Sequence, residues 1–569
     1  MKKILSCFVA VMLCISATSC ETSESGGNNA GNANQEQGTI HSHTYTRVEE
    51  IKPTCTESGH STYYTCDCGK IFVKKGYYEE TTLDSVSLKA KGHTFSEKVL
   101  SDEYLVSEAT DSAPQVFAKA CKYCGAKSES AADAFTYGKT LAEYQEAEKI
   151  LYEPSALTMS LYDAENCIYG FTWNTKTEPA RPVLKIKEKN GQTERFIRAQ
   201  FTAANSSELK NGNDISVTYY SCKAEIALTP NVEYVYSVGD KYVDMYTETA
   251  EIRAVNPKEN GSWKFVHASD SQAEGNKTDG GVGTGTAFSN VLKNICGSSD
   301  IKFMVHTGDV VEYSKYQSYW ENMLTPNFKY LSVMPIMAIS GNHETTYKNG
   351  SNETFNRFNY KIPVQQTQKG FYYSFSYGNV KFIMLNTNEE SSNNKLTSTQ
   401  YSWLENELKN KTEKWTIVSM HNPMYSVGKW GSNSKLNGIT LALADQLTGL
   451  FARYGVDIVL QGHDHMVSRT HPLNENGAAT EETIVSVNNA DYIKNPAGTI
   501  YVMNGPAGNQ AKGNNDIFPH DESLYAYANP SSVSSWAEFE VSGNKISVTV
   551  KTAKSGNAED ILIWGIIKD

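Results

Sequence analysis

Apolar and polar residues follow two different patterns in the long C-terminal part of this chain. Between residues 153 and 257, short runs such as "ALTMSLY", "CIYGFTW" and "EYVYSVGD" alternate apolar with polar positions and are separated by turn-forming residues. Because successive side chains of a strand point to opposite faces, this spacing predicts an all-β sandwich. From residue 258 to residue 569, apolar runs alternate instead with amphipathic, helix-compatible stretches such as "QYSWLENELKN". That order predicts an α/β fold in which helices cover the faces of the sheet.

Five of the apolar runs in the α/β region lead into polar side chains. They read "WKFVHASDSQ", "IKFMVHTGDVVE", "MPIMAISGNHE", "WTIVSMHNPMY" and "VDIVLQGHDH". In sheets of this kind, ligands gather beyond the carboxyl ends of the strands, so we expect the five ends to meet. The residues that would converge there are Asp270, Gln272, Asp309, Asn342, His421, His463 and His465.

Carboxylate, amide oxygen and imidazole are ligands of divalent and trivalent metal ions. The set is too large for one ion, and a carboxylate such as Asp309 can bridge two ions about 3.5–4 Å apart. Side chains alternate along "HDH", so His463 and His465 can project the same way while Asp464 points elsewhere, as a hydrogen-bonding partner. His343 remains as a histidine outside the ligand set. The sequence therefore predicts a two-metal centre.

The ordered series of motifs resembles that of the calcineurin-like metallophosphoesterases, and within them the purple acid phosphatase-like branch. The resemblance runs from about residue 150 to the C-terminus, and "AEIALTPNVEYVYSVGD" looks like the fibronectin-III-type domain that precedes many purple acid phosphatases. It implies an α/β metallophosphoesterase sandwich of mixed sheets flanked by helices over residues 258–569, after a fibronectin-III-like sandwich over 153–257.

The same resemblance implies a ligand set for each ion and a role for His343. His343 would lie near the leaving-group oxygen and act in catalysis, together with the bridging Asp309. One metal would be held by Asp270, Gln272, Asp309 and His465, and the other by Asp309, Asn342, His421 and His463.

Two positions depart from the family pattern. Gln272 stands where the family has a histidine, and an amide oxygen is a weaker, neutral donor, so manganese, calcium or iron suits that position as well as zinc. Glu312 stands where purple acid phosphatases carry the tyrosine that gives their colour, so we do not expect a purple protein. Glu312 itself is predicted to lie at the surface or next to the ligands; direct metal binding is the alternative.

These residues predict an exported, dinuclear-metal phosphoesterase that hydrolyses phosphate esters by attack of a metal-activated hydroxide. Its cofactors would be two ions of iron, manganese or zinc, with calcium also considered. The substrate would be a small-molecule, lipid or nucleotide phosphate ester. Two alternatives stay open: a phosphodiesterase acting on nucleotide or lipid-headgroup diesters, and a non-catalytic surface-binding protein that keeps a vestigial phosphatase fold.

The first twenty residues predict export. Lys2 and Lys3 precede a short apolar stretch that ends in "ATSC", which resembles a bacterial lipoprotein signal with Cys20 as the lipidated residue. Residues 21–40 are rich in Gly, Asn, Ser and Glu and predict a flexible tether. We therefore expect a protein of the bacterial cell envelope, anchored to the membrane by lipid outside the cytoplasm. Secretion without lipid, or an uncleaved anchor, are the alternatives.

Residues 41–130 contain a loose repeat that predicts a small Cys/His-rich module, followed by a connector over 131–152. In its first half, His43, Cys55, Cys66 and Cys68 supply three thiolates and one imidazole, a set that suits tetrahedral zinc. Disulfides are the alternative, because exported proteins meet an oxidising environment.

Length and charge add two limits. A chain of 569 residues is too long for one ordinary domain. Its net charge of −12 argues against nucleic acid as a partner, since the protein and the nucleic acid would both be negatively charged.

Overall fold

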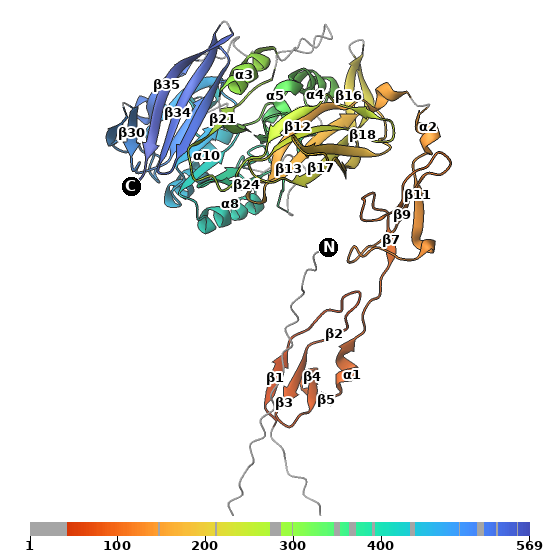
Figure 1. Cartoon of the computed structure of the whole chain (residues 1–569). Helices are drawn as coiled ribbons and strands as arrows, with labels where there is room; N and C mark the ends of the chain where they lie inside the picture. The colour runs from red at the N-terminus through yellow and green to blue at the C-terminus, as the bar shows by residue number, and fades with distance from the viewer. Residues whose placement is uncertain are drawn as a thin grey trace, which may run out of the picture. The chain divides into compact units, whose positions relative to one another are not determined.

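The structure is a computed structural model, shown in Figure 1. It describes residues 43–145, 148–210, 213–272, 286–298, 300–345, 353–363, 371–389, 393–432, 438–488, 490–508, 517–530, 533–554 and 556–569. The predicted signal, Cys20 and the tether lie outside these residues. The chain divides into two compact units, Met1–His93 and Thr94–Asp569, and the boundary falls inside the module predicted over 41–130.

The described part of the first unit is a small antiparallel sheet in the order β1-β3-β4-β5, with a separate pair β2-β6. Its core is thin: among the residues described in this unit, the buried apolar side chains are Cys55, Cys66, Phe72 and Val86. The elements are β1 (Tyr45–Val48), β2 (Gly59–His60), β3 (Tyr63–Cys66), β4 (Ile71–Lys74), β5 (Tyr78–Thr81), α1 (Leu83–Val86) and β6 (Ser87–Leu88).

The second unit begins with short hairpins whose last strand lies in the predicted connector. Asp102 in this region accepts hydrogen bonds from the guanidinium groups of Arg181 and Arg198, at 3.2 and 2.8 Å, which ties the hairpins to the following β-sandwich. The elements are β7 (Phe95–Glu97), β8 (Leu105–Ser107), β9 (Gln115–Ala118), β10 (Ala120–Cys121), β11 (Ala134–Tyr137) and α2 (Leu141–Gln145).

Residues 155–253 form an all-β region of two sheets, as the alternating pattern predicted. One sheet has the order β12-β13-β17-β16, and the other has the order β15-β14-β18-β19 with β20 also paired to β18. The strands are β12 (Ser155–Asp163), β13 (Ile168–Thr175), β14 (Pro182–Glu188), β15 (Arg195–Arg198), β16 (Gln200–Lys210), β17 (Asn213–Ala227), β18 (Glu233–Asp240), β19 (Met245–Tyr246) and β20 (Ala250–Arg253).

Two mixed sheets flanked by helices make up the rest of the chain. The first has the order β23-β22-β21-β33-β34-β35-β30-β29 and the second β24-β25-β26-β27-β31-β28-β32. The strands of the first sheet are β21 (Trp263–Ala268), β22 (Ile301–His306), β23 (Ile336–Ala338), β29 (Ile484–Val487), β30 (Ala490–Lys494), β33 (Ser535–Ser542), β34 (Lys545–Lys554) and β35 (Asn557–Ile567). Those of the second are β24 (Tyr373–Tyr377), β25 (Val380–Met384), β26 (Trp415–Ser419), β27 (Ile458–Gln461), β28 (Met466–Thr470), β31 (Ile500–Asn504) and β32 (Tyr525–Pro530).

Helices connect and cover these sheets. In Figure 1, α8 and α10 lie beside the second sheet, and α3 lies near β21 and β34. The helices are α3 (Thr286–Gly297), α4 (Gln317–Leu324), α5 (Phe328–Leu331), α6 (Asn342–Thr345), α7 (Glu353–Arg357), α8 (Ser398–Asn410), α9 (Lys429–Ser432) and α10 (Gly438–Arg453). In the part of the chain that the structure describes, no helix has the length and apolar character needed to span a membrane.

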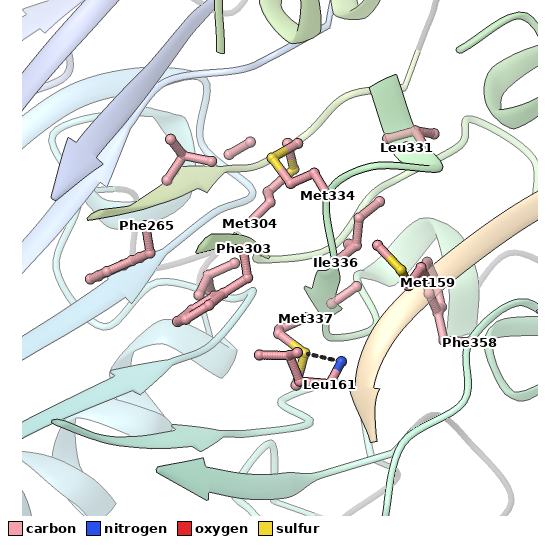
Figure 2. Packing of buried hydrophobic residues seen from close by; sticks show 14 of the residues in the cluster. Met159, Leu161, Phe265, Phe303, Met304, Leu331, Met334, Ile336, Met337 and Phe358 are labelled. Atoms are coloured by element: carbon pink, nitrogen blue, oxygen red, sulfur yellow. Dashed lines mark hydrogen bonds between the residues drawn. The ribbon is translucent and has the colours of Figure 1, made fainter. Parts of the chain in front are cut away.

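One hydrophobic core runs from the β-sandwich into the sheets that follow it. Phe265 and Phe303 stack with ring centroids 5.7 Å apart at the centre of the first sheet. Figure 2 shows the continuation past Met337 to Leu161 of strand β12, whose backbone N–H donates to Met337 Sδ at 3.4 Å. Because the apolar contacts are continuous, the sandwich supports the first sheet directly and is part of the same folding unit.

Candidate metal centre

The parallel strands bring the five polar ends together. Strands β21, β22 and β23 run parallel in the first sheet, and β26 and β27 run parallel in the second. All seven predicted ligands follow the ends of these strands. Direct contacts, described below, connect the seven into one cluster. Each ligand is therefore presented by the end of a buried strand, which holds its backbone rigidly.

Asp309, His421 and His463 form the centre of the cluster, with their ligand atoms within 4.8 Å of one another. His421 Nε2 lies 3.3 Å from Asp309 Oδ2 and 2.9 Å from Asn342 Oδ1. The other ring nitrogen, His421 Nδ1, donates to the carbonyl of Thr307 at 2.8 Å. That hydrogen bond fixes the ring so that Nε2 faces the carboxylate, the arrangement found in metal-ligating histidines.

Asp270, Gln272 and His465 join the cluster through further contacts. Asp270 Oδ1 lies 3.5 Å from His465 Nε2, and Asp270 Oδ2 accepts from the backbone N–H of His463 at 3.0 Å. Gln272 Nε2 donates to Asp309 Oδ2 at 3.4 Å. The carboxylate of Asp309 thus contacts Gln272 as well as His421, which is the position that a bridging ligand requires.

Two buried polar atoms of the cluster, Gln272 Oε1 and His465 Nδ1, have no hydrogen-bond partner among the residues that the structure describes. Leaving a buried acceptor unpaired costs about 1–3 kcal/mol. A bound cation would satisfy lone pairs of this kind, and carboxylate, amide and imidazole are the donors that such an ion accepts. The residues present therefore fit the metal ions that the motifs predicted.

Three of the candidate ligand residues adopt left-handed backbone conformations that residues other than glycine seldom take. The φ angles are 50° at Asp270, 52° at Asp309 and 72° at His463. Such conformations persist where the surrounding structure holds them, and they gather at functional sites. Gly308, with a φ of 96°, has no room for a Cβ, which would lie 2.6 Å from the backbone nitrogen of Gly341.

The carboxylate and imidazole groups of the centre hold one another in different charge states. Burial lowers the pKa of His421, but the Asp309 carboxylate more than offsets this and raises it to about 9. Burial, with the neighbouring His421, lowers the pKa of His463 to about 3. Burial raises the pKa of Asp309, but the charges of His421 and His343 outweigh it and hold that pKa well below its usual range. An ionised Asp309 and a neutral His463 are the states that bind metal ions, and His421 would give up its proton on binding one.

His343 lies at the edge of the cluster, where its side chain keeps 16% of its exposure. Its Nδ1 donates to the carbonyl of Glu312 at 2.8 Å, so Nε2 faces the cluster, 3.7 Å from Asp309 Oδ2. Burial lowers its pKa, but the charges of Asp309 and Glu312 together raise it. A protonated Nε2 at the open edge is suited to donate a proton. Glu312, at 3.8 Å from His343 Nδ1, neighbours the catalytic candidate.

Glu344 organises the centre, and the sequence motif alone assigned it no role. Its buried carboxylate accepts hydrogen bonds from the backbone N–H groups of Asp309, Val310 and Gly341, at 2.9, 2.9 and 2.8 Å. It therefore clamps the end of β22 to the end of β23. The signal in the sequence was the position of this carboxylate in "GNHE", directly after an apolar run.

Asp464 makes its hydrogen bonds away from the candidate ligands. The motif "HDH" lies in the bend between β27 and β28 and not on a strand, so side-chain alternation does not explain this direction. Its carboxylate accepts from Ser426 Oγ at 2.6 Å and from the backbone N–H of Trp430 at 3.1 Å. The ring of Trp430 then lies 5.0 Å from the ring of His463, between ring centroids. Trp430 thus stands beside the centre. Tyr425 instead packs on Tyr501, and Tyr347, the third aromatic residue considered for the pocket rim, lies outside the described residues.

Comparison with known proteins agrees with this geometry. Residues 264–467 match the family model for Calcineurin-like phosphoesterase, so this part of the chain is a calcineurin-like phosphoesterase domain. Purple acid phosphatase 23 of Arabidopsis thaliana is 27% identical to this chain over 233 residues, which cover 40% of this chain and 45% of the relative. Probable inactive purple acid phosphatase 24 of the same plant is 24% identical over 321 residues, covering 51% of this chain and 49% of the relative.

Among solved structures, the purple acid phosphatase PPD1 of yellow lupin (Lupinus luteus) has the same fold with a TM-score of 0.58. The two chains are 18% identical, and the match covers 74% of this chain and 75% of the lupin chain. The chain spans less than half of the length of the curated relatives named above. The expected metallophosphoesterase fold and the purple acid phosphatase-like relationship are confirmed at this level.

Proposed function

We propose that this protein is an exported phosphoesterase that hydrolyses phosphate esters at a two-metal centre. The observation that supports it most is the unbroken set of contacts among the seven donors, with His343 at the open edge. Asp270, Gln272, Asp309 and His465 would hold one ion. Asn342, His421 and His463 would hold the other together with Asp309. Iron, manganese and zinc suit these donors, and the neutral amide of Gln272 also admits calcium.

Metal ions at this centre would lower the pKa of bound water and would stabilise negative charge on the phosphoryl oxygens. The protein's own residues supply orientation and a proton. Hydrogen bonds from His421 Nδ1 to Thr307 and from three backbone N–H groups to Glu344 keep the ligands in place. His343 Nε2 delivers a proton to the departing ester oxygen, because its Nδ1 is already committed to the carbonyl of Glu312.

Hydrolysis of p-nitrophenyl phosphate by the full chain, after reconstitution with iron, manganese, zinc or calcium separately, tests the proposal. We expect turnover with at least one ion. A protein that binds these ions and stays inert toward every phosphate ester would overturn it and favour a non-catalytic role. That alternative has a specific motive, since one relative carries the description "Probable inactive purple acid phosphatase 24".

The kind of ester is the second part of the proposal. The Trp430 ring stands beside His463, and the Lys429 ammonium lies 5.2 Å from the Trp430 ring centroid. An aromatic ring and a cation at the edge of the centre favour phosphate esters with a large organic group, such as nucleotides or lipid headgroups. Comparing p-nitrophenyl phosphate with its bis-ester separates a phosphatase from a phosphodiesterase, which is the remaining alternative.

Export and anchoring are proposed from the first forty residues. Lipid attachment at Cys20 would hold the enzyme at the bacterial cell envelope, with residues 21–40 as a tether. Metabolic labelling with a radioactive fatty acid should mark the wild-type protein and leave Cys20→Ser unlabelled. Labelling that persists in Cys20→Ser, or wild-type protein found wholly in the medium, would remove the anchor from the proposal.

A further inference from the structure

Three soft metal donors of the first unit lie together, far from the phosphoesterase residues in the sequence. The ligand atoms of His43, Cys66 and Cys68 are all within 4.8 Å of one another. His43 Nδ1 lies 3.1 Å from Cys66 Sγ and 3.4 Å from Cys68 Sγ. Strand pairing produces this arrangement, because Tyr45 of β1 stands opposite Cys66 of β3, which brings the start of β1 to the end of β3.

The turn that carries the two cysteines has its backbone N–H groups directed at the first of them. Cys68 N–H donates to Cys66 Sγ at 3.4 Å, and Gly69 N–H donates to the carbonyl of Cys66 at 2.9 Å. Gly69 takes a φ of 79°, which glycine adopts without strain. The first of these bonds is directed at the sulfur of Cys66, the candidate ligand atom, and the second closes the turn that places Cys68 beside it.

We infer that His43, Cys66 and Cys68 bind a soft divalent ion of the zinc type, as the three ligands that lie together among the residues that the structure describes. Bond lengths of about 2.3 Å to sulfur and about 2.1 Å to nitrogen place tetrahedral donors about 3.6 Å apart. The two nitrogen–sulfur distances of 3.1 and 3.4 Å are close to that value. The inference is independent of the proposed phosphoesterase activity.

The ligand set differs from the one that the sequence suggested. Among the described residues, Cys55 lies outside the group formed by His43, Cys66 and Cys68. Asp67 sits next to the group and accepts from Cys66 Sγ at 2.9 Å, which places its carboxylate as a partner of the ligand sulfur.

Metal binding here has a clear structural purpose. The ring of His43 packs edge-on against Phe72, with centroids 4.8 Å apart, and Phe72 also contacts Tyr45. Phe72 is one of the few buried apolar side chains in the described part of this unit. Units of this size commonly need a metal or a disulfide to fold stably. An ion shared by His43 and the β3–β4 turn would join the two edges of that core.

Cobalt substitution of the full chain tests the inference, because thiolate ligands give cobalt a charge-transfer absorption in the near ultraviolet. The phosphoesterase centre contributes none of it, since its donors are oxygen and nitrogen. We expect Cys68→Ser and His43→Ala each to reduce this absorption and to lose one equivalent of zinc. The matched control Cys296→Ser, at an exposed cysteine on α3, should change neither. Unchanged zinc content and absorption in both site variants would overturn the inference.

A measurement on the wild-type protein covers the case in which a variant fails to fold. Cys68 is exposed, so its alkylation by iodoacetamide can be followed by peptide mass spectrometry with zinc present and after chelation. Zinc should slow the labelling of Cys68 at least tenfold and leave that of Cys296 unchanged. Equal labelling with and without zinc, or isolation of the protein with Cys66 or Cys68 in a disulfide, would overturn the inference.

Discussion

The carboxylate of Glu344 accepts a hydrogen bond from the backbone N–H of Asp309 at 2.9 Å, and a second from the N–H of Gly341 at 2.8 Å. The ends of β22 and β23 are thereby joined beneath the metal centre. Asp309 needs such a support, because its φ of 52° is one that an aspartate adopts only when it is held. The central ligand is therefore positioned by a residue that does not itself belong to the ligand set.

Replacing Glu344 with glutamine should disrupt the centre without touching a ligand. The amide of glutamine offers one acceptor in place of two, so at least one buried N–H loses its partner, at a cost of about 1–3 kcal/mol. We expect a lower melting temperature and reduced metal content, measured by calorimetry and by elemental analysis. The exposed Glu475→Gln serves as the control. Wild-type stability and metal content in Glu344→Gln would show that the clamp is dispensable.

Asp309→Asn should abolish phosphoesterase activity and metal binding together. Its carboxylate contacts Gln272, His421 and His343, so the charge that all of them share is removed at once. Titration calorimetry with manganese or zinc, combined with the hydrolysis assay, checks both effects. Asp445→Asn, at an exposed ion pair with Lys395, should behave as wild type. Full activity of Asp309→Asn would rule out a bridging role.

His343→Ala should slow turnover by about 10²–10⁴-fold, the usual contribution of a general acid, while both metals remain bound. The side chain approaches Asp309 only to 3.7 Å and is more exposed than those of His421 and His465. The pH dependence of kcat should lose its upper limb in this variant. His471→Ala is a suitable control, because His471 pairs with Glu482 at 2.9 Å. Loss of metal from His343→Ala would instead assign His343 to binding.

Gln272→His should tighten metal binding at the position that Gln272 occupies. Imidazole is a stronger donor than an amide oxygen for zinc and iron, and the buried Oε1 of Gln272 has no hydrogen-bond partner in the described part of the chain. We expect an increase in affinity of about tenfold or more by competition with a chelator, with Gln192→His as an exposed control. Unchanged metal content and affinity would argue that Gln272 is not a ligand.

Asp464→Asn should affect substrates with aromatic groups more than small ones. The carboxylate holds Ser426 and the backbone of Trp430, and so keeps the Trp430 ring beside His463. Releasing that segment should raise KM for p-nitrophenyl phosphate by about tenfold, the effect of one charged hydrogen bond, and change KM for glycerol phosphate little. Trp430→Ala should reproduce the selectivity. Equal effects on both substrates would mean that the ring does not meet the leaving group.

The candidate ligands could be recognised in the sequence because each one follows an apolar run directly. A strand and its polar end are local features, and the carboxyl ends of parallel strands share an edge, so Asp270, Asp309 and His463 could be assigned to one place. The outward direction of Asp464 was expected from alternation along a strand, but "HDH" lies in the bend between β27 and β28, so the conformation of that bend sets the direction. Glu344 could not be assigned a role in this way, because its partners include the backbone of a strand end more than thirty residues away.

The sequence by itself determined which strands carry metal-binding chemistry and how side chains alternate along them, because both depend on neighbouring residues. Only the tertiary structure decided which donors meet. Strand register places His43 with Cys66 and Cys68 and leaves Cys55 outside that group, and the packing of two sheets sets Asp309 against His421. Those contacts join residues distant in the chain, and their distances arise from the balance of packing over the whole core, which no short segment specifies.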